Sequence, residues 1–170
     1  MMTDISAASR SAMILCIVIG SSFVSVVWLG PVISGSSQIP FVDVDWMGSN
    51  WRSSRENLLI VDAQTWQDLW TSMKSGESDP PSLPYVNFTA ELLIAVFLGE
   101  FGSSGYVAKI TAVFLILSSY RVFVDEFHPD PNCATCTVMT SPCHIIRIPR
   151  AQQDFPATFV YSVHVVSCMP

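Results

Sequence analysis

Cysteine offers the widest choice of covalent and metal chemistry in this chain, and four cysteines lie in its C-terminal third. Cys133 and Cys136 form a C-x-x-C pair, and Cys143 and Cys168 follow. Such a pair carries out thiol redox chemistry when a helix N-terminus lowers the pKa of its first thiol. The proline-broken segment 129–132 precedes the pair, and no helical periodicity follows it. The surroundings therefore do not favour a redox centre.

Zinc binding and disulfide formation are the other uses open to these cysteines. His128 and His144 would add nitrogen ligands that zinc accepts, but the second pair of candidate ligands is irregularly spaced. An export-like apolar segment near the N-terminus indicates an oxidising compartment, where disulfides persist. We therefore expect no metal and no other cofactor. The candidate disulfide cysteines, whose pairing the sequence leaves open, are Cys133, Cys136, Cys143 and Cys168.

The sequence lacks the signatures of other catalytic sites. Residues 102–105, read GSSG, do not have the G-x-S-x-G spacing of a hydrolase nucleophile. Asp125 and Glu126 are adjacent, so a strand would direct their carboxylates to opposite faces. No phosphate-binding loop, H-E-x-x-H motif or dinucleotide fingerprint is present. We expect the chain not to be an enzyme, with an exported thiol oxidoreductase or small hydrolase as the alternative.

The loop at residues 102–106 is the candidate site for binding a protein partner. Glycines let the backbone approach a partner closely, while serines and a tyrosine supply hydrogen bonds and an aromatic anchor. The candidate contact residues are Gly102, Ser103, Ser104, Gly105 and Tyr106. The other interpretation is a tight turn with Tyr106 packed in the core, and the sequence leaves both open.

Long apolar runs predict the strands on either side of this loop. Residues 92–98 contain no charge and no breaker, which is typical of a strand buried on both faces. Residues 107–117 and 121–127 are two further strand-like runs separated by Ser118 and Ser119, and we expect them to form a hairpin. Residues 58–61, 144–148 and 158–166 complete a set of about six strands.

One amphipathic helix is expected to pack on these strands. Asp62 is suited to cap its N-terminus, and Gly76 to end it. An apolar stripe with helical spacing consists of Trp66, Leu69, Trp70 and Met73. The expected fold class is α+β: a mainly antiparallel sheet with one helix packed on it, preceded by an N-terminal apolar helix.

The N-terminal region predicts export. Residues 11–33 are uncharged and long enough to cross a bilayer, either as a lasting anchor or as a cleaved signal peptide. We expect this leader at 1–34, a tether at 35–56 and the domain at 57–168, membrane-anchored with the domain exported, or secreted. Asn87 begins an N-glycosylation triplet, which has meaning only in a host that glycosylates exported proteins. A net charge of −6 without a basic cluster argues against a nucleic-acid partner.

Four pieces of sequence, in order, make residues 58–159 resemble the C-terminal domain of the PrcB family, which is named for a subunit of a bacterial surface protease complex. They are residues 62–70 (DAQTWQDLW), 86–88 with 93–100 (LIAVFLGE), 102–106 (GSSGY), and Cys133 with 140–142 and 145–150 (IIRIPR). Ser104 replaces a glycine that the family usually has, Cys143 replaces an aromatic residue, and Cys136 is an addition. The resemblance implies an exported, non-catalytic accessory protein that binds or stabilises a surface protease or another envelope protein.

Overall fold

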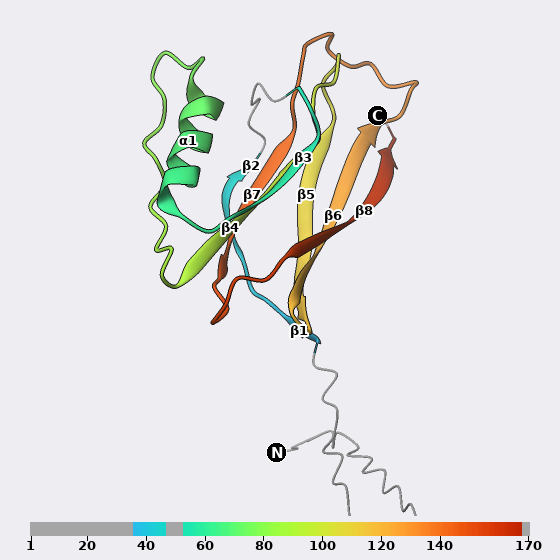
Figure 1. Cartoon of the computed structure of the whole chain (residues 1–170). Helices are drawn as coiled ribbons and strands as arrows, with labels where there is room; N and C mark the ends of the chain where they lie inside the picture. Colours follow the sequence, from blue (N-terminus) through green and yellow to red (C-terminus); the bar gives the residue numbers. More distant parts are fainter. Residues whose placement is uncertain (1–35, 47–52, 168–170) are drawn as a thin grey trace, which may run out of the picture. The chain divides into compact units, whose positions relative to one another are not determined.

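The computed structural model describes residues 36–46 and 53–167. These residues form eight strands and one helix, and the strands make two four-stranded sheets (Figure 1). The first sheet has the order β1-β5-β6-β8 and the second β2-β7-β4-β3. The elements in chain order are β1 (Ser36–Gln38), β2 (Val42–Trp46), β3 (Glu56–Ile60), α1 (Ala63–Lys74), β4 (Glu91–Phe97), β5 (Val107–Ile116), β6 (Ser119–Pro129), β7 (Cys143–Pro149) and β8 (Ala157–Val166).

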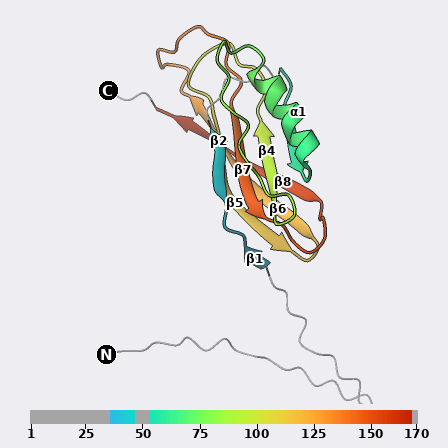
Figure 2. The same ribbon diagram turned by 90° about the vertical axis from the view of Figure 1, so that its left-hand side faces the viewer.

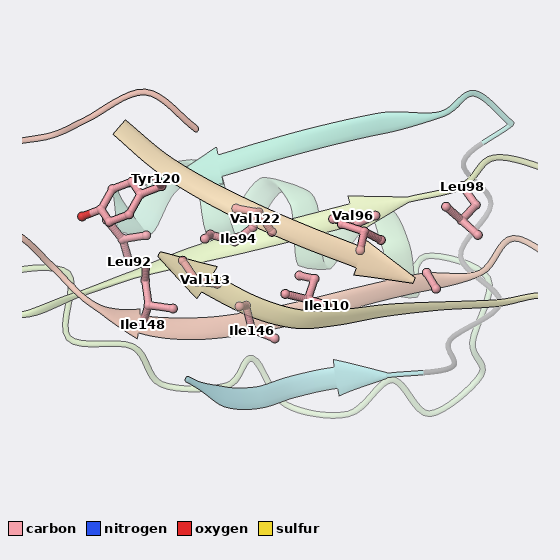
Figure 3. Packing of buried hydrophobic residues seen from close by; sticks show 12 residues of the cluster. Leu92, Ile94, Val96, Leu98, Ile110, Val113, Tyr120, Val122, Ile146 and Ile148 are labelled. Atoms are coloured by element: carbon pink, nitrogen blue, oxygen red, sulfur yellow. The ribbon is translucent and has the colours of Figure 1, made fainter. Parts of the chain in front are cut away.

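The two sheets pack face to face around one apolar core. Leu92, Ile94 and Val96 of β4 are fully buried on the side that faces the first sheet. Val113 of β5 and Val122 of β6 meet them from the opposite side (Figure 3). Each fully buried large aliphatic side chain stabilises the fold by about 1.5–3 kcal/mol relative to an exposed one, so this layer holds the sheets together.

Helix α1 covers the other face of the second sheet (Figure 2). Its buried stripe is the one that the sequence predicts, Trp66, Leu69, Trp70 and Met73. The stripe packs on Leu93, Ala95 and Phe97, the alternate side chains of β4. Asp62 caps the helix by accepting a hydrogen bond of 2.8 Å from Thr65 N. Strand β4 is therefore buried on both faces, as its uninterrupted apolar run predicts.

The predicted fold class is wrong in its arrangement of strands. The described residues form eight strands in two stacked sheets, rather than about six strands in one sheet with a helix on it. Strand β8 runs parallel to β6, so the first sheet is not purely antiparallel. The described part of the chain is mostly β, because its one helix has only 12 residues whereas eight strands form the two sheets.

Two of the strands come from the segment expected to be a tether. β1 pairs with β5, and β2 pairs with β7. Both are short, with three and five residues. β1 reads SSQ and has no apolar side chain, whereas β2 reads VDVDW and alternates apolar with acidic residues, a strand pattern inside the segment expected to be a tether. The expected N-terminal apolar helix, residues 11–33, lies outside the described residues. Within the part of the chain that the structure describes, no helix is both long enough and apolar enough to cross a membrane.

A buried histidine joins the two sheets. Ile110 N of β5 donates a hydrogen bond of 2.8 Å to His144 Nδ1 of β7. His144 Nε2 lies 3.1 Å from Asp43 Oδ1 of β2. Because Nδ1 accepts this hydrogen bond, the ring is neutral and Nε2 carries the proton. Burial lowers the pKa of His144 below its ordinary value of 6.5, although the nearby carboxylate of Asp43 opposes the shift.

We expect the free energy of unfolding to decrease as the pH falls below about 6.5, because the unfolded chain then binds a proton at His144 that the folded chain does not. His144→Asn retains a side-chain acceptor for Ile110 N but does not titrate. Urea unfolding of both proteins from pH 7.5 to 5 should show a smaller pH dependence in His144→Asn. Equal slopes in the two proteins would contradict this role of His144.

Candidate functional site

The glycine-serine loop is fixed to a second loop by backbone and side-chain hydrogen bonds. Phe101 and Thr140 exchange two of them, with N to O distances of 2.8 and 2.9 Å. Ser104 N donates to Cys136 O, and Cys136 N donates to Ser104 Oγ, both at 3.0 Å. Thr140 Oγ1 donates to Ser103 O at 2.8 Å. We call residues 101–106 and 136–140 together the paired tip; both segments lie at the same end of the sandwich (Figure 1).

The two glycines of the loop have different roles. Gly105 has φ +99°, and a Cβ there would lie 3.2 Å from the Pro129 Cβ, so a side chain would be strained. Gly102 is exposed, and a Cβ there would meet no atom within 4 Å. Ser104 is not among the described residues with positive φ. The left-handed position therefore falls on Gly105 alone, and Gly102 leaves open space in front of the backbone.

Tyr106 lies in a ring cluster at the base of the loop. Its ring stacks on Phe101 with centroids 3.9 Å apart and an interplanar angle of 14°. The edge of His128 packs against it at 5.1 Å. Tyr106 is half-buried. The ring therefore supports the loop from below, and it is not a freely exposed anchor for a partner.

Two exposed apolar side chains of the paired tip are missing from the candidates chosen by sequence. Val138 is 49% exposed and Met139 is 57% exposed. They lie in the segment that pairs with the glycine-serine loop. The signal that could have found them is weak: two apolar residues between threonines, in a stretch without the length or alternation of a strand. Together with Gly102 they give the tip an exposed surface that is partly apolar.

A charged cluster lies between the sheets near the paired tip. The guanidinium of Arg55 binds both carboxylate oxygens of the buried Glu126, and His128 Nε2 lies 3.2 Å from Glu126 Oε2. The hydrogen bonds from Arg55 lower the pKa of Glu126 below its ordinary value, against the effect of burial. Arg55 also lies over the ring of Tyr161, with its Cζ 5.0 Å from the centroid. The carboxylate thus fixes the histidine on which Tyr106 packs.

The candidate cysteines do not form one centre. Neither the exposed Cys136 nor the buried Cys143 is in a disulfide, so the short Cys133–Cys136 disulfide is not formed. Cys143 packs in the cluster under α1, whereas His144, the next residue of the strand, binds toward the first sheet. Cys168 lies outside the described residues. Among the residues that are described, no three His, Cys, Asp or Glu side chains are placed to hold a metal ion.

Asn87 lies in the turn before β4. Its side chain is exposed and accepts hydrogen bonds from Thr89 N at 3.2 Å and Thr89 Oγ1 at 2.6 Å. The asparagine of the triplet is therefore accessible at the surface, at the opposite end of β4 from the paired tip.

The paired tip and the strands that hold it lie in a segment with known relatives. Residues 92–149 match the family model of the PrcB C-terminal domain. The PrcB C-terminal match covers β4 to β7 and both halves of the paired tip, about one third of the chain. Helix α1 and strand β8 lie outside it. No curated protein and no solved structure matches this chain.

The resemblance found in the sequence is thereby confirmed for these residues. It points to an accessory role associated with a protease complex. The C-x-x-C pair falls inside the match, but it lies in a loop where no helix begins, so the usual means of activating the first thiol is missing.

Replacing Arg55 tests the charged cluster. We expect Arg55→Met to lower the free energy of unfolding by about 2 kcal/mol at pH 7, because the buried Glu126 keeps its charge but loses its strongest partner. Partial exposure of Arg55 keeps the loss below that of a fully buried pair. The contribution is present above the ordinary pKa of 4.5 and disappears as the pH falls through the lowered pKa of the folded state.

Glu126→Gln is the matched control for this cluster. Denaturant unfolding of both single variants and the double variant should show that Arg55→Met costs much less when residue 126 is uncharged. Equal losses in the two backgrounds would mean that the guanidinium stabilises the fold through packing alone.

Thiol labelling tests the assignment of the cysteines. In the folded full-length chain, Cys136→Ser should remove one rapidly reacting thiol, because the Cys136 side chain is exposed. Cys143→Ala should leave the rapid phase unchanged, because Cys143 is buried beneath α1 and reacts only on unfolding. A loss of rapid reaction in Cys143→Ala would show that this part of the core opens in the native state.

Proposed function

We propose that this chain is a non-catalytic accessory module that binds a protein partner, a subunit of a surface protease or another envelope protein, through the paired tip. The observation that carries the proposal is the exposed surface formed by Gly102, Val138 and Met139 on two loops that are bonded to each other. This surface lies inside the segment that matches the PrcB C-terminal domain.

The geometry of the tip suits recognition of a folded surface. Its two loops are joined by five hydrogen bonds at residues 101–104 and 136–140, so little backbone freedom is lost on binding. The unbranched thioether of Met139 can adapt to an irregular apolar partner. Gly102 lets a partner approach the backbone. These features support binding, and none of them supplies a nucleophile or a general base.

We further propose that residues 1–34 export the chain, as an anchor or a cleaved signal, and that the domain acts outside the cytoplasm. The support is the uncharged apolar sequence of residues 11–33 together with the match to a family named for a protease complex subunit. Sequencing the N-terminus of the mature protein would distinguish an anchor from a cleaved signal.

Site-specific photo-crosslinking tests the binding surface. A benzophenone amino acid at Met139 of the full-length chain, expressed in its own host, should form a covalent product with one main partner, to be identified by mass spectrometry. The matched control carries the same group at Tyr85, which is 82% exposed but lies before the opposite end of β4. Equal products from both positions would contradict a binding site at the tip.

Gly102→Trp adds a test that does not disturb the fold. The substitution enters open space at a residue without positive φ, so thermal unfolding should change little. The bulky ring should reduce the Met139 crosslink at least tenfold by blocking the approach of the partner. An unchanged crosslink would place the contact elsewhere, and turnover of a substrate by the purified chain would overturn the accessory role.

A further inference from the structure

Three of the four sheet edges in the described structure carry features that discourage pairing with another strand. The edges are β1 and β8 of the first sheet and β2 and β3 of the second. β1 has three residues, and β3 has five and begins with Glu56. β2 carries Asp43 and Asp45 at an irregularity in its register. Short length, charge and bulges are the usual protections of an edge strand.

Strand β8 has none of these protections. It is ten residues long, reads ATFVYSVHVV, and contains no Asp, Glu, Lys, Arg or Pro. Its parallel register with β6 runs without a shift from Ala157 to Val166. It lies at one edge of the first sheet (Figure 1). An exposed edge of this length and composition is a template for a further strand.

Backbone geometry shows which residues of β8 face the free edge. Tyr120 N donates to Pro156 O at 2.8 Å, and Asp130 N donates to Val166 O at 3.0 Å. Even-numbered residues therefore point their backbone groups toward β6. Because successive residues of a strand point their N–H and C=O groups to opposite sides, Phe159, Tyr161 and the two valines at 163 and 165 direct theirs outward. In the described part of the chain β8 pairs with β6 alone.

The side chains of these outward-directed residues form an incompletely covered row. Phe159 and Tyr161 pack against the core between the sheets. Val163 and Val165 continue the row, but they are 58% and 63% exposed. The two aromatic side chains of the row are therefore half-buried, and the two valines are exposed.

We propose that β8 pairs antiparallel with β8 of a second copy of this chain, about a two-fold axis at Ser162. This register sets Tyr161 opposite Val163 of the partner subunit, and Phe159 opposite Val165 of the partner subunit. Each exposed valine then meets an aromatic side chain on the same face. The two copies of Ser162 face each other at the axis, on the outer face of the continuous sheet.

The strand is self-complementary in three respects. Each pair formed by the four outward-directed residues can exchange two backbone hydrogen bonds, as antiparallel pairing requires. Residues opposite each other across the axis point their side chains to the same face, so the inner and outer faces of the sheet continue into the second copy. The absence of ionised side chains removes the like-charge repulsion that a two-fold axis would otherwise place across the strands. This dimer is independent of the paired tip.

Disulfide crosslinking tests the register. Ser162→Cys is introduced into the full-length chain carrying Cys136→Ser, which removes the exposed thiol of the described residues. The two Cα atoms at the axis should be about 4.5 Å apart, the spacing of a non-hydrogen-bonded pair, which a disulfide spans. Mild oxidation should give a covalent dimer in at least five times the yield of the background chain.

Val160→Cys is the matched control, because it lies on the same exposed face two residues away. In the proposed register its two copies are about 14 Å apart, too far for a disulfide. Adding His164→Cys to Val160→Cys should restore crosslinking, since these positions lie opposite each other. Equal yields from Ser162→Cys and Val160→Cys would overturn the register.

A second measurement tests the dimer itself. Sedimentation of the full-length chain in detergent should give a dimer, and Val163→Lys should shift it to a monomer by adding a charge to the free edge. Val42→Lys, at a similarly exposed valine of β2, should remain dimeric. The proposed dimer would be wrong if the unmodified chain sedimented as a monomer. It would also be wrong if Ser162→Cys formed crosslinks only with a different protein.

Discussion

The fold depends on the burial of β4 on both faces. Its alternate side chains serve two apolar clusters, one between the sheets and one beneath α1. A charged side chain at any position from Leu92 to Phe97, or a small one in place of a large apolar residue there, would disrupt one of these clusters, because each position is fully buried. The first segment of the paired tip, residues 101–106, follows this strand, so a strand that is buried on both faces supports the candidate binding surface.

Strong local patterns predicted much of the core. The stripe that begins at Trp66 has helical spacing over two turns, and residues 92–98 are apolar without interruption, so the element type and the buried faces could be predicted from the sequence. The second sheet layer could not be read in this way. β1 has only three polar residues, and the five-residue alternation of β2 does not show that it pairs with β7. The residue pattern of one short segment does not show with which distant strand that segment pairs.

The candidate site, too, could be predicted from the sequence only in part. Gly102 and Gly105 mark the loop through their composition, and Gly105 has the positive φ that its residue type suggests. Val138 and Met139 could not be assigned to the surface by sequence, because their exposure depends on the hydrogen bonds between two loops more than thirty residues apart. Likewise, the sequence could not show that Tyr106 supports the loop, because this role depends on the contacts of its ring with Phe101 and His128.

The first sheet has its earliest and latest strands at its two edges, β1 at one and β8 at the other. Between β6 and β8 the chain crosses to the opposite layer to form β7 and then returns. The parallel pairing of β6 with β8 therefore joins residues separated by a whole strand of the other sheet. Contacts this distant in sequence slow folding, since the intervening chain must be ordered first. During synthesis this sheet stays incomplete until β8 has emerged from the ribosome.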